Sequence, residues 1–170
     1  MSKPSKISDE IWEAYCRTII QFHPHGAPVE HRINIQPAVT GGGDWAWGDS
    51  VSEVFVLSPG NPYSQYLSDM ENLYREVDLV KLVKHSGINF ENCLGMSSDE
   101  DWVERSLLLW NVDRDLVHEW GARFEQNAYF RLTPDSFEVI SLVDERYNKS
   151  GWRSQFIVSD EFEEDYLGVW

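Results

Sequence analysis

The chain has 170 residues, of which 42% are hydrophobic, and a formal net charge of −15 at pH 7. This length and apolar content suit a single globular domain over residues 1–170 with a sizeable core. The negative charge repels nucleic-acid phosphates and argues against direct DNA or RNA binding. It leaves two interpretations open, which are simple solubility and attraction to a basic protein surface.

The sequence contains no apolar run near the roughly 20 residues that span a bilayer. The first six residues are not followed by the apolar stretch of a secretory signal. We therefore expect a cytoplasmic protein that makes no contact with a membrane.

Periodic apolar residues and capping residues predict the elements in chain order. Ser8 or Asp9 begins a helix that reaches about Ile20, and Pro24 and Gly26 end that segment. Alternation of apolar and polar residues predicts an extended segment over 29–39. The elements expected after it are a strand at 53–57, a helix at 64–85, strands at 88–94 and 103–112, a helix capped by Asp113, and strands at 128–132 and 137–143.

The order of these elements predicts the fold. From residue 54 it is strand, helix, strand, strand, helix, strand, which is the split βαβ arrangement of ferredoxin-like folds. Right-handed crossovers then give an antiparallel sheet with two helices on one face. We predict an α+β fold with this core over 54–143, an N-terminal helix and strand extension (1–53), and a C-terminal extension (144–170) after a closing hairpin.

Polar residues follow or precede three of the predicted strands, and this topology places them at one edge of the sheet. The carboxylate of Glu104 is the candidate general acid or base in this set. The neutral groups expected to bind a small polar ligand beside it are Asn61, Ser64, Asn72, Ser106, Gln126 and Asn127. Ser64 is expected to open the long helix, where free N–H groups favour anions. The alternative is that these side chains only cap helices and turns.

The same residues carry a family resemblance. Four motifs occur in order: Asn61-Pro62-Tyr63-Ser64, Glu71-Asn72 with Arg75, Trp102-Val103-Glu104-Arg105-Ser106, and Phe124-Glu125-Gln126-Asn127-Ala128. Over about residues 54–132 the chain resembles the bacterial "domain of unknown function 3293" family. Gly60, Arg105 and Glu125 depart from the residues that the family carries there. The resemblance implies the position of a site, and it implies no activity or cofactor.

Two further groups of residues suggest other functions. Trp45 and Trp47 follow a run of glycines and are candidates for an aromatic lid. His23, His25 and His31 are candidates for a metal site, and three imidazoles suit a catalytic zinc. A metal-dependent hydrolase is therefore one alternative to the polar-ligand pocket, although no cofactor is expected from the spacing.

The C-terminal segment gives the other alternative. It has five acidic residues within 160–165 and ends in aromatic and apolar residues. Amphipathic acidic segments dock on their own domain or on another protein. The chain is then an interaction module for a basic protein surface, with a nucleic-acid mimic as one form of it.

Overall fold

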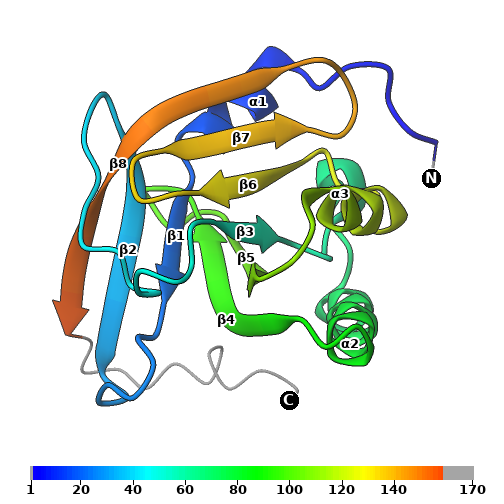
Figure 1. Cartoon of the computed structure of the whole chain (residues 1–170). Helices are drawn as coiled ribbons and strands as arrows, with labels where there is room; N and C mark the ends of the chain where they lie inside the picture. Colours follow the sequence, from blue (N-terminus) through cyan, green and yellow to red (C-terminus); the bar gives the residue numbers. More distant parts are fainter. Residues whose placement is uncertain (1, 159–170) are drawn as a thin grey trace.

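A computed structural model describes residues 2–158 as a closed antiparallel barrel with helices on its outside (Figure 1). Neighbouring strands around the barrel follow the order β1-β2-β8-β7-β6-β3-β5-β4. The strands are β1 (Ile19–Phe22), β2 (His31–Ala38), β3 (Val54–Leu57), β4 (Asn89–Met96), β5 (Val103–Trp110), β6 (Ala128–Leu132), β7 (Phe137–Ser141) and β8 (Tyr147–Val158). The helices are α1 (Asp9–Cys16), the 3₁₀ turn η1 (Pro62–Ser64), α2 (Asp69–His85) and α3 (Arg114–Arg123).

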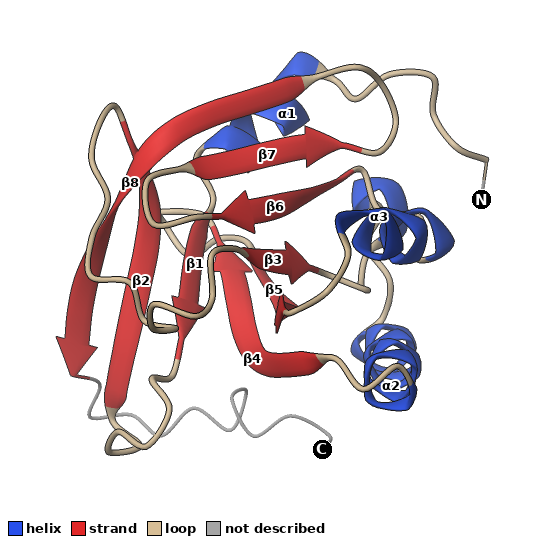
Figure 2. Ribbon diagram, in the orientation of Figure 1, coloured by secondary structure: helices blue, strands red, loops and turns tan. Residues whose placement is uncertain are grey.

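The prediction of an open, ferredoxin-like α+β sheet is wrong. The two segments interpreted as extensions contribute β1, β2 and β8, and with β7 these strands close the sheet into a barrel (Figure 2). The residues of β8 were missed because few of them are apolar, and of its twelve residues only Gly151 and Trp152 are buried. Pairing between β1 and β4, or β2 and β8, joins distant segments and has no local sequence signal.

Two apolar clusters hold the fold together. One contains Phe22, Ile35 and Leu108, and the other contains Leu107, Leu109 and side chains of α2 and α3. Successive residues of a strand face opposite sides, so β5 contributes to both clusters. A fully buried side chain of this size stabilises the fold by about 1.5–3 kcal/mol. Helices α2 and α3 are therefore fixed against one part of the barrel wall.

Helix α1 is shorter than predicted. Ser8 caps it as expected and accepts a hydrogen bond from the Ile11 N–H, but the helix ends at Cys16. Ile19 and Ile20 continue the helical spacing yet lie in β1, where Ile20 is fully buried and pairs with Ile35. Burial between two neighbouring strands outweighs the local preference.

Helix α2 begins five residues later than predicted. Ser68, not Ser64, is the N-cap, and Glu71 completes a capping box with it. The first turn also contains Asp69, so capping groups and negative charge occupy the helix N-terminus. The expected attraction of this helix start for anions is therefore not supported.

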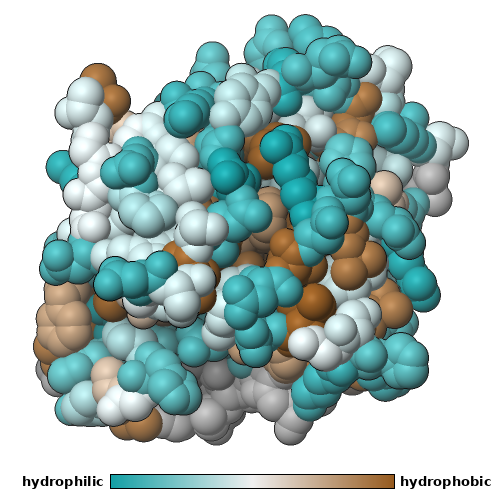
Figure 3. Space-filling model, in the orientation of Figure 1, coloured by the Kyte–Doolittle hydropathy of each residue, from teal (hydrophilic) through white to brown (hydrophobic). Residues whose placement is uncertain are grey.

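The surface is mainly polar on the face shown in Figure 3, with apolar residues gathered toward the middle and right of the view. None of the helices within residues 2–158 combines the length and the apolar character needed to cross a bilayer. The acidic segment at 160–165 and the aromatic end of the chain lie outside the described residues.

Candidate functional site

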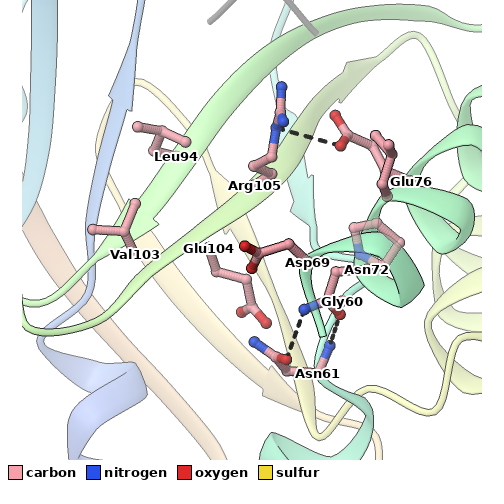
Figure 4. Close-up of a pocket in the computed structure, with 11 residues that line it drawn as sticks. Gly60, Asn61, Asp69, Asn72, Glu76, Leu94, Val103, Glu104 and Arg105 are labelled. Carbon is pink, nitrogen blue, oxygen red and sulfur yellow. Dashed lines mark hydrogen bonds and ion pairs between the residues drawn. The ribbon is translucent and has the colours of Figure 1, made fainter. Parts of the chain in front are cut away.

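Asn61 and Glu104 come together at the mouth of the barrel where β3 ends and β5 begins. They line a polar cavity of about 460 Å³ with Asn72, Glu76 and Arg105. Figure 4 shows the Glu104 carboxyl and the Asn61 side chain pointing toward one another. The remaining lining residues are Pro59, Gly60, Asp69, Leu73, Leu94 and Val103.

The position of Asn61 is fixed by a reciprocal pair of hydrogen bonds with Asn72. The Asn61 backbone N–H donates to Asn72 Oδ1 (2.9 Å), and Asn72 Nδ2 donates to Asn61 Oδ1 (3.0 Å). The N–H of Leu67 also donates to Asn61 Oδ1 (3.1 Å). Both polar atoms of Asn72 thus hold the chain after β3, so Asn72 positions the site from α2.

Gly60 gives this arrangement the space it needs. A Cβ atom built on Gly60 would lie 3.0 Å from Asn72 Oδ1 and 3.7 Å from Glu104 Oε1. The first distance is tighter than an ordinary contact, so a side chain at this position disturbs the Asn61–Asn72 pair.

Glu104 is half-buried and is an unusual carboxyl group. Burial raises its pKa from 4.5 to about 7, although hydrogen bonds from the Asn61 and Ser58 side chains act in the opposite direction. Removing a carboxylate from water disfavours its charged form, which accounts for the direction. At neutral pH this group is therefore able both to accept and to donate a proton.

Gln126 ties the turn after α3 to the chain after β3. It is 5% exposed, and its Nε2 donates to Gly60 O (2.8 Å) and Phe124 O (3.0 Å). Arg75 bridges the same segments, because its Nε donates to Pro59 O (2.6 Å) and its Nη2 donates to Phe124 O. Gln126 therefore supports the site from behind and does not line the cavity.

Ser64 lines a second, smaller cavity of about 240 Å³ that shares Asn61 and Glu104 with the first, and Asn127, which lines neither cavity, contacts Ser64. Asn127 Nδ2 donates to Ser64 Oγ (2.9 Å), which also lies 3.1 Å from the Tyr15 hydroxyl. Within residues 2–158, the buried Oδ1 atom of Asn127 has no hydrogen-bond partner. A water molecule or a ligand donor would satisfy it.

Three aromatic residues of this second cavity were not among the predicted site residues. Tyr15 comes from α1, Tyr66 follows η1, and Trp102 precedes β5. Burial raises the pKa of the Tyr15 hydroxyl, and the Glu104 charge acts in the same direction, while the Ser64 hydrogen bond opposes it. The sequence offers one signal for Tyr15, which is that its side chain combines an apolar ring with a hydroxyl group. Such a side chain suits a position where the apolar core meets a polar site.

The chain between β3 and α2 has strained backbone geometry. Asn61, Tyr63 and Ser64 have φ values of 43°, 48° and 60°, a region that non-glycine residues rarely adopt. The Tyr63 N–H is held by Glu125 O (2.7 Å), and Glu125 itself has φ 55°. Such strain persists only where surrounding contacts impose it, and it is concentrated at functional sites.

Other predicted residues lie away from these cavities. Ser106 is buried in β5, deeper than Glu104 on the same side of the strand, and lines neither cavity. Trp45 and Trp47 pack against Trp152 and Phe22. Trp45 also donates to Val51 O, before the start of β3, whereas Asn61 follows its end. The two tryptophans are therefore near the opposite end of the barrel.

Within residues 2–158, the three histidines do not form a group that could hold a metal ion. His23 Nδ1 lies 3.0 Å from His31 O, while His25 is 95% exposed and lies 3.9 Å from Glu91. In the part of the chain that the structure describes, no group of three or more His, Cys, Asp or Glu residues is arranged to hold a metal ion.

The fold and these contacts define a closed antiparallel β-barrel with a carboxyl-containing polar site at one mouth. Residues 57–129 match the model of a family described as "Protein of unknown function (DUF3293)". This match confirms the resemblance over the segment that contains Asn61, Asn72, Glu104 and Gln126, and it carries no activity. Neither the comparison with curated proteins nor that with solved structures found a match.

Proposed function

We propose that this chain binds a small polar ligand at Asn61 and Glu104, and that Glu104 exchanges a proton with the bound ligand. The observation that carries the proposal is the position of Glu104. Its carboxyl has a pKa of about 7 and lies between two cavities that both include Asn61. Titratable groups perturbed by burial inside a cavity are characteristic of functional sites.

The polar cavity supplies groups of both signs around Glu104. Arg105 Nε lies 3.3 Å from Glu76 Oε2, and burial raises the pKa of Glu76 despite this partner. Asp69 adds a further carboxylate to the rim. Amide, guanidinium and carboxyl groups within one cavity suit a ligand with several hydrogen-bonding groups.

The test is a comparison of small-metabolite binding to the wild-type chain and to Glu104→Gln by ligand-observed NMR. Glutamine keeps the shape of the side chain and removes its ionisation. Glu119→Gln, on the exposed face of α3, is the matched control. We expect at least one ligand to bind the wild type and the control with the same affinity. The same ligand should bind Glu104→Gln at least about tenfold more weakly.

The proposal fails if every ligand binds the wild type and Glu104→Gln with the same affinity. A proton-transfer role also requires a pH dependence. The affinity of such a ligand should change across pH 6–8 in the wild type and stay constant in Glu104→Gln.

A further inference from the structure

The smaller cavity has a different chemical character from the polar one. Its lining includes the aromatic side chains of Tyr15, Tyr66 and Trp102, together with Ile11 and Ala14 from the same helix as Tyr15. Glu104 is the acidic residue of this lining. Three aromatic residues and one carboxyl group thus line a space of about 240 Å³, beside Asn61 and Ser64.

This combination favours one class of ligand. The negative face of an aromatic ring attracts a cation, and aromatic cages are used to bind ammonium groups. A carboxylate adds a counter-charge, while apolar walls disfavour an anion or a strongly hydrated metal ion. The net charge of −15 also attracts cations to the surface from a distance.

We propose that Tyr15, Tyr66, Trp102 and Glu104 form a binding site for the ammonium group of a small organic cation. The inference rests on the proposed function, because Glu104 belongs to both cavities. It names the ligand class, with the cationic end between the aromatic rings and Glu104. A polar remainder of the ligand would extend past Asn61 toward Asn72 and Arg105.

The size of the cavity agrees with this assignment. Sites for drug-sized molecules occupy about 300–1,000 Å³, so 240 Å³ suits a single small head group. Tyr66 is 82% exposed, so replacing it leaves the core unchanged. Substitutions at Tyr66 therefore test the site without testing the stability of the fold.

The decisive probes are choline and 3,3-dimethylbutan-1-ol, which have the same shape and differ in charge. Each is titrated into the full wild-type chain at pH 8, with binding followed through the indole N–H signal of Trp102 and by calorimetry. We expect choline to bind at least about tenfold more tightly than the neutral alcohol. Equal affinity for the two probes, or absence of choline binding, would overturn the inference.

Three variants locate the bound cation. Tyr66→Leu and Glu104→Gln should each weaken choline binding about fivefold or more, since one removes an aromatic face and the other the counter-charge. Tyr74→Leu, an exposed tyrosine on α2 outside both cavities, should bind choline as the wild type does. Unchanged choline binding in both Tyr66→Leu and Glu104→Gln would place the cation elsewhere and refute the assignment.

The outcomes separate this inference from the proposed function. In one outcome, neutral or anionic ligands bind in a way that depends on Glu104, and choline binds no more tightly than its neutral isostere. This outcome would support the polar-ligand proposal and refute the ammonium site. Choline binding that requires Tyr66 but is unaffected in Glu104→Gln would remove the shared role of Glu104, and with it the stated link between the two cavities.

Discussion

Asn61 and Glu104 face each other at one mouth of the barrel, and each of them lines both cavities. Asn61 follows β3, and Glu104 is the second residue of β5, the strand that pairs with β3. The side chain of Asn61 hydrogen-bonds Glu104 and lowers its pKa, while burial raises that pKa more strongly. The balance between these two effects leaves a carboxyl group that ionises near neutral pH.

The raised pKa of Glu104 should be visible in the stability of the protein. Because the folded-state pKa of about 7 exceeds 4.5, the folded state holds a proton that the unfolded state loses over this range. The wild type should lose stability as pH rises from 4.5 to 7, on the order of 2 kcal/mol. In Glu104→Gln this part of the pH dependence should be absent, as measured by urea unfolding. Parallel curves for the two proteins would contradict the assignment.

Gly60→Ala should disturb the site while leaving the barrel folded. The added Cβ would lie 3.0 Å from Asn72 Oδ1 and would displace the Asn61–Asn72 pair. We expect a loss of about 1 kcal/mol in stability and weaker binding of any ligand that depends on Glu104. Gly95→Ala, in the β4 residue that pairs with Glu104, is the control, because its methyl group makes only ordinary contacts, 3.7 Å from Thr18 Cγ2 and 4.0 Å from Glu104 O and Ser106 Oγ. Equal binding by the two variants would show that Gly60 is not required.

Gln126→Ala should destabilise the protein through the turn after α3. The change removes two hydrogen bonds and leaves the carbonyls of Gly60 and Phe124 without this donor. Loss of a buried donor of this kind costs about 1–3 kcal/mol. The control is Gln65→Ala, at an exposed position in the neighbouring loop. Thermal unfolding that is the same for both variants would argue against a supporting role for Gln126.

Helix α1 should be held in place by Arg146. The Arg146 guanidinium donates to Ile7 O, lies 3.1 Å from Asp9 Oδ1 and sits 5.3 Å from the centre of the Trp12 ring. Arg146→Ala should raise amide hydrogen exchange in residues 9–16 by about tenfold. It should also weaken ligand binding, because α1 carries Tyr15. Exchange in Lys149→Ala, which changes an exposed residue of β8, should match the wild type.

The outer wall of the barrel contains a carboxylate whose ionised form is stabilising. Burial alone would raise the pKa of Glu138, but hydrogen bonds from Tyr147 and Arg131 hold it below its usual value. The contribution of ionised Glu138 to the stability of the fold is present above pH 4.5, and it is lost as the pH falls through the lowered pKa of this residue. Glu138→Gln should cost about 1–3 kcal/mol at pH 7, and the difference from the wild type should shrink toward pH 3. A constant difference across this range would exclude the ionisation as its source.

The sequence carried enough information to place most elements from β3 to β7, because their caps and apolar patterns are local. Asp113 caps α3 as its position indicates, accepting from the Asp115 N–H. The closure of the barrel could not be predicted from local caps and apolar patterns. Gly151 shows why, since a Cβ there would lie 2.6 Å from the backbone of Thr40 and Gly41. The need for glycine in β8 comes from a segment more than one hundred residues away.

The candidate site was predictable in part for a related reason. Asn61, Glu104 and Gln126 lie at the ends of strands and helices whose positions the local pattern indicates. The strands next to these residues, β3, β5 and β6, are neighbours in the closed barrel, as they are in the predicted open sheet. Tyr15 was not predicted, because the path from α1 into β1 depends on pairing with β4. A sequence pattern contains no measure of such long-range pairing.

The most direct measurement is a ¹³C NMR titration of the Glu104 carboxyl in the wild type and in Asn61→Gly, which keeps the positive φ of residue 61 accessible. We predict a pKa of about 7 in the wild type and a higher value in the variant, because the variant lacks the Asn61 hydrogen bond. A wild-type pKa near 4.5, unchanged in Asn61→Gly, would show that Glu104 is an ordinary solvated carboxylate and would contradict the proposed site.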